Sequence, residues 1–223
     1  MAAIFLMAAL LAASGPLENA RDRQDRASLE KQISELSAAA KKTPRDANAQ
    51  YFLALASSYL AEVSLEMRDK DRAARVAQSG IDAIQRAIAL NSRNAEYYRV
   101  LGTLNGQVVP ANLLYAFTYG RRARDAISKA LELDPKSARA HLARGVGNYY
   151  LPESLGGGPP VAIPDFRKAA ELDPSSAEPY LWLGLALRKQ HKNAEARQAF
   201  EKARRLDPGR VWIKVQLDKT PAK

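Results

Sequence analysis

Residues 177–210 read AEPYLWLGLALRKQHKNAEARQAFEKARRLDPGR, and this stretch decides the fold class. Its first half spaces apolar or small residues by three and four positions: Tyr180, Leu183, Gly184 and Leu187. Its second half repeats the spacing with Ala196, Ala199, Phe200 and Ala203. This spacing is typical of an amphipathic helix. Because only a short polar turn separates the two segments, we expect two antiparallel helices that pack side by side. Gly184 and Ala196 would let the two backbones approach closely.

The end of this stretch recurs upstream in the chain. Leu-Asp-Pro occurs at 133–135, 172–174 and 206–208, each time after an amphipathic segment. Proline ends a helix there because its nitrogen carries no hydrogen. The aspartates that precede the prolines indicate turn hydrogen bonds, and not an acid/base pair. The prolines are 39 and 34 residues apart, and a period of this length predicts an array of helix pairs.

The pattern of residues 177–210 resembles the tetratricopeptide repeat (TPR) family, whose unit is two antiparallel helices in about 34 residues. The resemblance covers roughly residues 27–210 and implies an all-α chain. The implied architecture is an α-α superhelix, a TPR solenoid of about four helix pairs with capping helices. We divide the chain into 1–20 (signal peptide and linker), 21–46 (N-terminal capping helix), 47–94 (divergent first repeat), 95–137 (second repeat with a long turn), 138–176 (third repeat with a glycine-rich loop), 177–210 (fourth repeat) and 211–223 (C-terminal cap and tail).

Two segments depart from the repeat pattern. Pro164 interrupts the second helix of the third repeat, so we expect that helix to begin near Ala162 or to kink. Residues 211–217 alternate like a strand, but a lone strand would have no partner in this fold. A short capping helix that packs through Trp212 and Val215 is therefore the interpretation that we favour.

The N-terminal residues have features of a targeting signal. Ile4 to Ala13 is an unbroken apolar run, too short to cross a bilayer core, and small residues follow it. A secretory signal fits, although no Lys or Arg precedes the run; a misplaced start and a buried N-terminal helix are the alternatives. We expect a periplasmic or secreted protein without a transmembrane segment in the mature chain, the alternative being a cytoplasmic one.

Composition excludes several kinds of chemistry. The chain has no cysteine, and its two histidines, His141 and His191, are far apart in sequence. Gly156–Gly158 is followed by two prolines instead of Lys-Ser/Thr, so it is a rigid turn and not a phosphate loop. We expect a substitution at Gly157 to cost less stability than one at Gly184. We expect no catalytic residue, no metal site, no cofactor and no enzyme activity.

Because the net charge is +10, anionic partners such as nucleic acid or an anionic membrane have to be considered. Its excess is concentrated from Arg167 to Lys223, on expected outer faces that also carry acids. We interpret it as a solvated surface, with an acidic partner or an anionic envelope surface as the alternative. No nucleic-acid motif is present, and no nucleic-acid partner is expected.

In the resembled family, the first helices of the repeats line a concave face that binds a protein or peptide. On that frame the candidate groove residues are Tyr51, Tyr59, Arg99, Arg139, Tyr149, Tyr150 and Arg188. Leu181 and Leu185 of the fourth repeat also map to the groove. Tyrosine and arginine carry much of the binding energy at interfaces. The alternative for Tyr149 and Tyr150 is that they pack under the glycine-rich loop. One family subtype clamps a chaperone carboxylate with Lys and Asn, but Tyr51 and Leu55 stand at those positions here.

These observations predict a non-enzymatic scaffold that mediates protein–protein interaction through its concave face. The alternative is an accessory subunit of a periplasmic transport system that binds a partner protein or a small ligand. The sequence leaves the partner's identity and the oligomeric state open.

Overall fold

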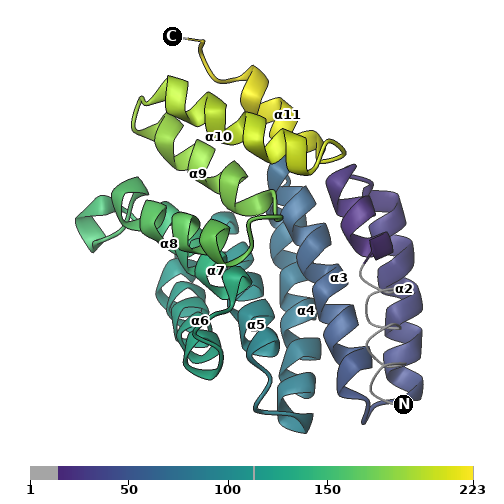
Figure 1. Ribbon diagram of the computed structural model, residues 1–223. Helices are drawn as coiled ribbons and strands as arrows, with labels where there is room; N and C mark the ends of the chain where they lie inside the picture. Colours follow the sequence, from purple (N-terminus) through teal and green to yellow (C-terminus); the bar gives the residue numbers. More distant parts are fainter. Residues whose placement is uncertain (1–14, 113, 223) are drawn as a thin grey trace. The chain divides into compact units, whose positions relative to one another are not determined.

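The computed structural model describes residues 15–112 and 114–222, which are helical and contain no β-strand, so the all-α prediction is confirmed. The chain divides into two compact units, residues 1–122 and 123–223, and each is described by itself. Figure 1 shows the helices coloured along the sequence. The expected signal segment, residues 1–14, lies outside the described residues.

Unit 1 is built from long helices that pack against their neighbours in sequence. After helical residues 15–22 come α2 (Arg26–Lys42), α3 (Ala47–Glu66), α4 (Lys70–Leu90) and α5 (Ala95–Val108). A 3-10 turn, η1 (Val109–Ala111), and a π-helical turn, η2 (Ala116–Gly120), follow α5. Helix α3 packs along α2 and α4, and α5 packs against both α3 and α4. The divergent first repeat thus consists of α3 and α4.

The N-terminal cap differs from the expectation. Residues 15–20 were expected to be linker, but residues 15–22 are helical, and Leu17 and Ala20 are buried in the unit 1 core. Gln24 reverses the chain into α2 with a φ of 54°. The cap is therefore a pair of helices, because two apolar side chains on the short segment have a core to pack against.

Unit 2 contains the more regular repeats. It comprises α6 (Arg121–Leu133, whose first two residues belong to unit 1), α7 (Ala138–Tyr150), η3 (Glu153–Leu155), α8 (Pro159–Leu172), α9 (Glu178–Lys189), α10 (Asn193–Leu206) and α11 (Val211–Asp218). Helix α7 packs against α8, and α9 against α10. Helix α8 also contacts α9, and α11 packs on α10. Two helix pairs and a capping helix thus share one core.

The Leu-Asp-Pro segments end helices as predicted. Helices α6, α8 and α10 end at Leu133, Leu172 and Leu206. Each following aspartate accepts a main-chain N–H two residues on: Asp134 from Lys136 at 3.1 Å, Asp173 from Ser175 at 3.2 Å and Asp207 from Gly209 at 3.0 Å. The aspartates fix the turn into the next helix.

Glycines allow the close crossings within both pairs of unit 2. A Cβ on Gly184 would lie 2.6 Å from Cε1 of Phe200, and a Cβ on Gly145 would lie 2.6 Å from Cε1 of Phe166. The expected contact between Gly184 and the second helix is therefore confirmed. The expectation that a substitution at Gly157 costs less stability than one at Gly184 is wrong. Gly157 is buried, and a Cβ there would lie 2.4 Å from the main-chain oxygen of Leu151.

The two segments that depart from the repeat pattern form helices α8 and α11. Helix α8 begins at Pro159, before the expected Ala162, because prolines in a first turn need no internal N–H partner. Pro164 lies inside the helix on an exposed side. The expected C-terminal helix is confirmed as α11, but Ile213 and Leu217 are its buried apolar residues, while Val215 is half-buried.

Candidate functional site

The first helices of the helix pairs carry all of the predicted groove residues. In unit 1, Tyr51 and Tyr59 lie on α3, and Arg99 lies on α5. The three residues belong to one polar network. In unit 2, Arg139, Tyr149 and Tyr150 lie on α7, and Arg188 lies on α9. Each unit therefore holds its own set.

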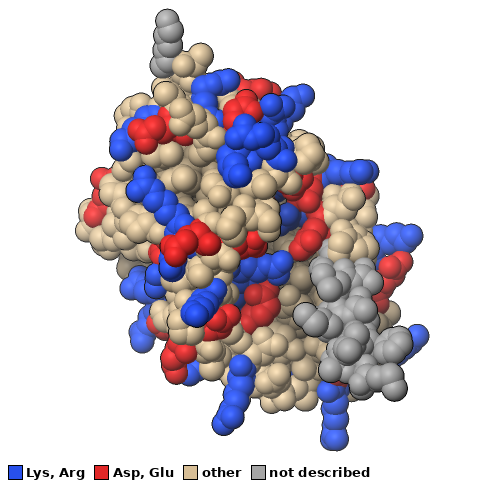
Figure 2. Space-filling view, viewed as in Figure 1, with Lys and Arg blue, Asp and Glu red and all other residues tan. Residues whose placement is uncertain are grey.

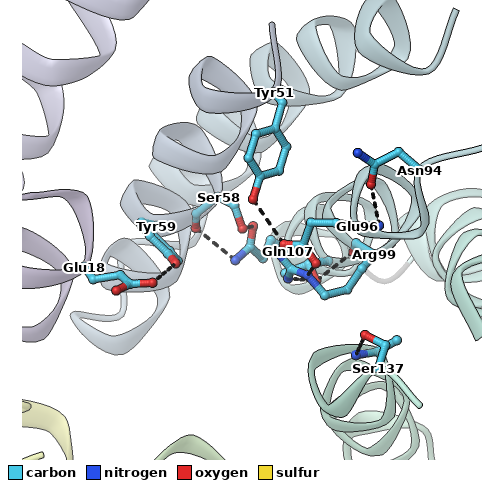
Figure 3. A network of polar contacts seen from close by, with 11 residues as sticks. Glu18, Tyr51, Ser58, Tyr59, Asn94, Glu96, Arg99, Gln107 and Ser137 are labelled. Carbon is cyan, nitrogen blue, oxygen red and sulfur yellow. Dashed lines mark hydrogen bonds and ion pairs between the residues drawn. The ribbon is translucent and has the colours of Figure 1, made fainter. Parts of the chain in front are cut away.

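The network of unit 1 satisfies its own polar groups (Figure 3). The Tyr51 hydroxyl donates to Oε1 of Glu96 at 3.2 Å, and Arg99 donates to both Glu96 oxygens at 2.7 and 2.8 Å. The Tyr59 hydroxyl donates to Oε1 of Glu18 at 3.4 Å. Further along α3 and α5, Ser58 and Gln107 exchange two hydrogen bonds, at 3.0 and 3.3 Å.

Arg99 stays charged inside this network. Burial on its own would lower the pKa of Arg99, but the ion pair and hydrogen bonds with Glu96 outweigh burial and raise the pKa above its ordinary value. A buried guanidinium paired in two hydrogen bonds is costly to separate from its carboxylate. Arg99 therefore holds the Glu96 carboxylate that accepts a hydrogen bond from Tyr51 of α3.

The tyrosines of unit 1 are also withdrawn from solvent. Tyr51 is 7% exposed and Tyr59 is 9% exposed. The Tyr51 ring stacks on Tyr97 with centroids 5.3 Å apart, and the Arg21 guanidinium lies 5.0 Å from the Tyr59 ring centroid. A partner would have to break these contacts to use either ring. The predicted groove residues of unit 1 are thus internal contacts of the unit.

Unit 2 instead presents a continuous group of aromatic rings, which we name the four-ring face: Tyr149, Tyr150, Trp182 and Trp212. The Tyr149 and Tyr150 centroids are 5.1 Å apart, and each lies within 5.9 Å of Trp182. Trp182 in turn lies 5.7 Å from Trp212. The rings come from α7, α9 and α11. Edge-to-face contacts of this kind hold each ring in place without covering both of its faces.

The four-ring face is partly open and carries positive charge. Tyr150 is 66% exposed, and the other three rings are half-buried. The Lys189 ammonium lies 4.8 Å from the Tyr149 ring centroid, a cation–π distance. Burial raises the pKa of the Tyr149 hydroxyl, and the charge of Arg188 opposes that rise. The face therefore combines apolar rings with a nearby ammonium.

The remaining predicted residues of unit 2 lie elsewhere. Arg188 donates to the main-chain oxygen of Gln216 at 3.0 Å and to Oγ1 of Thr220 at 3.2 Å, so it holds the end of α11. Arg139 is exposed in the first turn of α7, whereas Tyr149 is in its last turn. At 1.5 Å per residue the two are about 15 Å apart along the helix. The structure does not bring these arginines together.

Sequence reasoning did not assign the two tryptophans to the site, and it gave Trp212 only a packing role in the C-terminal cap. Leu181 and Leu185 were mapped to the groove, but both are buried in the unit 2 core, and Trp182 occupies the open face. Tyr149, Trp182 and Trp212 are spaced by roughly one repeat, and this regular spacing of aromatic residues is the signal that could have identified the tryptophans. Tyr149 and Tyr150 pack against Trp182 of α9.

Other kinds of site are not seen in the part of the chain that the structure describes. Over residues 15–112 and 114–222, no group of three or more His, Asp or Glu side chains is placed to hold a metal ion. No helix in those ranges is long and apolar enough to cross a membrane. His141 is half-buried, and its Nε2 lies 3.0 Å from the Pro135 oxygen, as in a packed histidine. Figure 2 shows basic and acidic side chains interspersed over the viewed face.

Comparison with known proteins agrees with this geometry. Residues 156–211, which include α8, α9 and α10, match the family model described as tetratricopeptide repeat. TTC0263, a thermophilic TPR protein from Thermus thermophilus, is 19% identical over 93% of this chain and 97% of its own, with a TM-score of 0.66. The HusA haemophore from Porphyromonas gingivalis is 18% identical over 77% and 91% of the two chains, with a TM-score of 0.59.

A search of curated proteins finds no match. The likeness to the two solved structures establishes the fold, and the family model covers the repeat that follows the family pattern most fully. Paired antiparallel helices, glycine crossings and Leu-Asp-Pro stops recur along the described chain. The chain thus has the fold of tetratricopeptide-repeat proteins, and residues 156–211 match the model of that family.

Proposed function

We propose that the protein is a non-enzymatic scaffold that binds an extended segment of a partner protein on the four-ring face of unit 2. The observation that carries the proposal is the contact series from Tyr149 and Tyr150 through Trp182 to Trp212. Tyrosine and tryptophan are the residues most enriched at binding hot spots, because their rings bury a large area at little entropic cost.

The chemistry of the face suggests what the segment contains. Proline or aliphatic side chains pack well on the faces of aromatic rings, and an extended backbone presents them at regular intervals. Lys189 lies beside Tyr149 at one end of the series and would favour a carboxylate there. We therefore expect a short, extended, apolar segment with an acidic residue near one end.

Unit 1 makes a different contribution in this proposal. The hydroxyls of Tyr51 and Tyr59 and the guanidinium of Arg99 already have partners within the unit. Such a satisfied network stiffens the helices that it joins. We assign these residues to the structure of unit 1 and not to the binding of a partner.

The test begins with a random peptide display library selected on the immobilised full chain. A selected peptide is synthesised with a fluorescent label, and its affinity is measured by anisotropy. Tyr150→Ala and Trp182→Ala should each weaken binding by at least about tenfold, since hot-spot truncations cost about 2 kcal/mol or more. Lys189→Ala should weaken binding of an acidic peptide by a smaller factor that shrinks as salt is added.

Phe117→Ala provides the matched control, because Phe117 is an exposed aromatic side chain of unit 1. Its removal should leave peptide affinity unchanged. If the selection yields no peptide that competes for one site, or if Tyr150→Ala and Phe117→Ala bind equally well, the proposal fails. A thermal melt of each variant separates lost binding from lost folding.

Export belongs to the same proposal and rests on the sequence of residues 1–14 alone. In the periplasm, the four-ring face could bind a component of a transport system. N-terminal sequencing of protein isolated from cells should find a start near Ser14. A chain that begins at Met1 or Ala2 would contradict export by this signal.

A further inference from the structure

The segment between α5 and α6 carries the most exposed large apolar side chains of the described residues. Leu114 is 71% exposed and Phe117 is 81% exposed. They are three positions apart in sequence: Leu114 lies in the turn that precedes the π-helical turn η2, and Phe117 lies within η2. Exposed apolar side chains that stand together mark an interaction surface more often than isolated ones do.

The same segment is fixed to unit 1 by its other side. The rings of Tyr115 and Tyr119 pack edge to face with centroids 5.4 Å apart, and both lie against the unit 1 core. The Tyr119 hydroxyl accepts a hydrogen bond from Nε2 of Gln78 on α4 at 3.3 Å. The outward position of Leu114 and Phe117 is therefore set by inward contacts of their neighbours.

Positive charge adjoins the exposed pair. Arg121 and Arg122 are exposed and follow η2 directly, and the Arg122 guanidinium lies 5.6 Å from the Tyr119 ring centroid. Arg75 of α4 joins Tyr119 and Arg122 in lining a shallow hollow, which also includes one acid, Asp82. No Asp or Glu occurs from residue 97 to residue 124. The apolar pair thus stands at the edge of a cationic surface.

We propose that residues 114–122 dock unit 1 on a bilayer surface that contains anionic lipids. Leu114 and Phe117 enter the boundary between headgroups and acyl chains, while Arg75, Arg121 and Arg122 bind headgroup phosphates. Two apolar side chains alone give weak attachment, and neighbouring cations supply the remainder on an anionic leaflet. Exposed apolar side chains beside cations are the combination that an anionic bilayer surface binds.

The test is co-sedimentation of the full chain with two kinds of vesicle, phosphatidylcholine alone and phosphatidylcholine mixed with phosphatidylglycerol. Binding should require phosphatidylglycerol and should weaken as salt is raised. Phe117→Ser and Leu114→Ser should each lower the partition coefficient by about tenfold, the value expected when one buried apolar side chain is lost. Arg121→Gln with Arg122→Gln should remove the preference for phosphatidylglycerol.

Leu155→Ser is the matched control, because it removes an exposed apolar side chain of unit 2 and should leave vesicle binding unchanged. All variants keep residues 1–14, so the apolar run there contributes equally to each. The proposal is overturned if Phe117→Ser partitions like the wild type, or if the wild type ignores phosphatidylglycerol. It is equally overturned if gel filtration shows self-association that Phe117→Ser abolishes while no variant binds vesicles.

Discussion

The guanidinium of Arg188 on α9 donates to the main-chain oxygen of Gln216 at 3.0 Å and to its side-chain Oε1 at 2.7 Å. Arg197 on α10 adds a bond to the main-chain oxygen of Thr220 at 2.7 Å. The main-chain oxygen of Gln216 lies in the last turn of α11, where carbonyls have no helical donor, and Thr220 lies just beyond the helix. Two cations therefore cap the last helix and stabilise its dipole.

This relationship predicts that Arg188→Ala destabilises unit 2. Charge-assisted hydrogen bonds contribute about 1.5–3 kcal/mol, and Arg188 is only half-buried, so we expect a loss of about 1–2 kcal/mol. Both tryptophans of the chain lie in unit 2, so a melt followed by tryptophan emission reports on this unit. Arg204→Ala, which breaks an exposed pair with Glu201, should change the stability by less than about 0.5 kcal/mol. Equal losses for the two variants would contradict the capping role.

Two glycines on α7 should respond in opposite directions to the same substitution. Gly145→Ala places a Cβ against the Phe166 ring and should cost about 1–3 kcal/mol. Gly147→Ala meets nothing within 4 Å and should stabilise the helix by about 0.5–1 kcal/mol. Urea denaturation followed by tryptophan emission measures both. A destabilising Gly147→Ala, or a neutral Gly145→Ala, would reject the packing of α7 on α8.

The turn between α9 and α10 stores backbone strain that glycine should release. His191 is exposed and has a φ of 61°, a conformation that costs a non-glycine residue about 1 kcal/mol. His191→Gly should therefore raise the stability of unit 2 by about 0.5–1 kcal/mol, after the entropy that glycine adds to the unfolded chain. Gln190→Gly is the neighbouring control, because Gln190 has a φ of −91° and gains no relief. Stabilisation by both variants, or by neither, would show that the strain is absent.

These turns show why part of the fold was predictable. A proline cannot continue a helix, and a glycine opposite a phenylalanine ring permits a close crossing. Pro174, Pro208 and Gly184 could therefore be interpreted from their covalent structure and spacing alone. The left-handed residues Gln24, Arg68 and His191 were not predicted, although each lies between two helices. Their conformation is imposed by the helices on either side, and the side chains give no sign of it.

The candidate site was less predictable, for a geometrical reason. Adjacent residues on a helix are about 100° apart, so an error of one position exchanges a buried face for an open one. That error placed Leu181 in the groove and omitted Trp182. The partners of Arg99 and Arg188 depend on which side chain a neighbouring helix brings within reach. Glu96 and Gln216 were not identifiable as partners without the packed helices.

Asp165 on α8 holds α7 through polar contacts that the repeat pattern does not contain. Arg144 donates to both of its oxygens at 2.6 to 3.1 Å, and Asn148 donates to one at 3.4 Å. The hydrogen bond to Asp165 raises the pKa of Arg144, and the aspartate itself is buried. Because the Arg144 side chain is 46% exposed, we expect Asp165→Asn to cost about 1–2 kcal/mol.

Glu171→Gln is the control for Asp165→Asn, since it breaks the exposed pair with Lys168 on the same helix. Its cost should stay below about 0.5 kcal/mol. Guanidinium chloride would screen the ion pairs, so urea melts are the appropriate measurement. Similar losses for the two variants would mean that Asp165 contributes no more than a surface charge.

Tryptophan emission during peptide binding tests the central claim most directly, because Trp182 and Trp212 are the only tryptophans and both belong to the four-ring face. A display-selected peptide without tryptophan should shift the emission to shorter wavelength as it excludes water from the rings. The shift should saturate at the affinity found by anisotropy, and Tyr150→Ala should displace both curves by at least about tenfold. A peptide that binds with unchanged tryptophan emission would place the binding surface elsewhere and contradict the account.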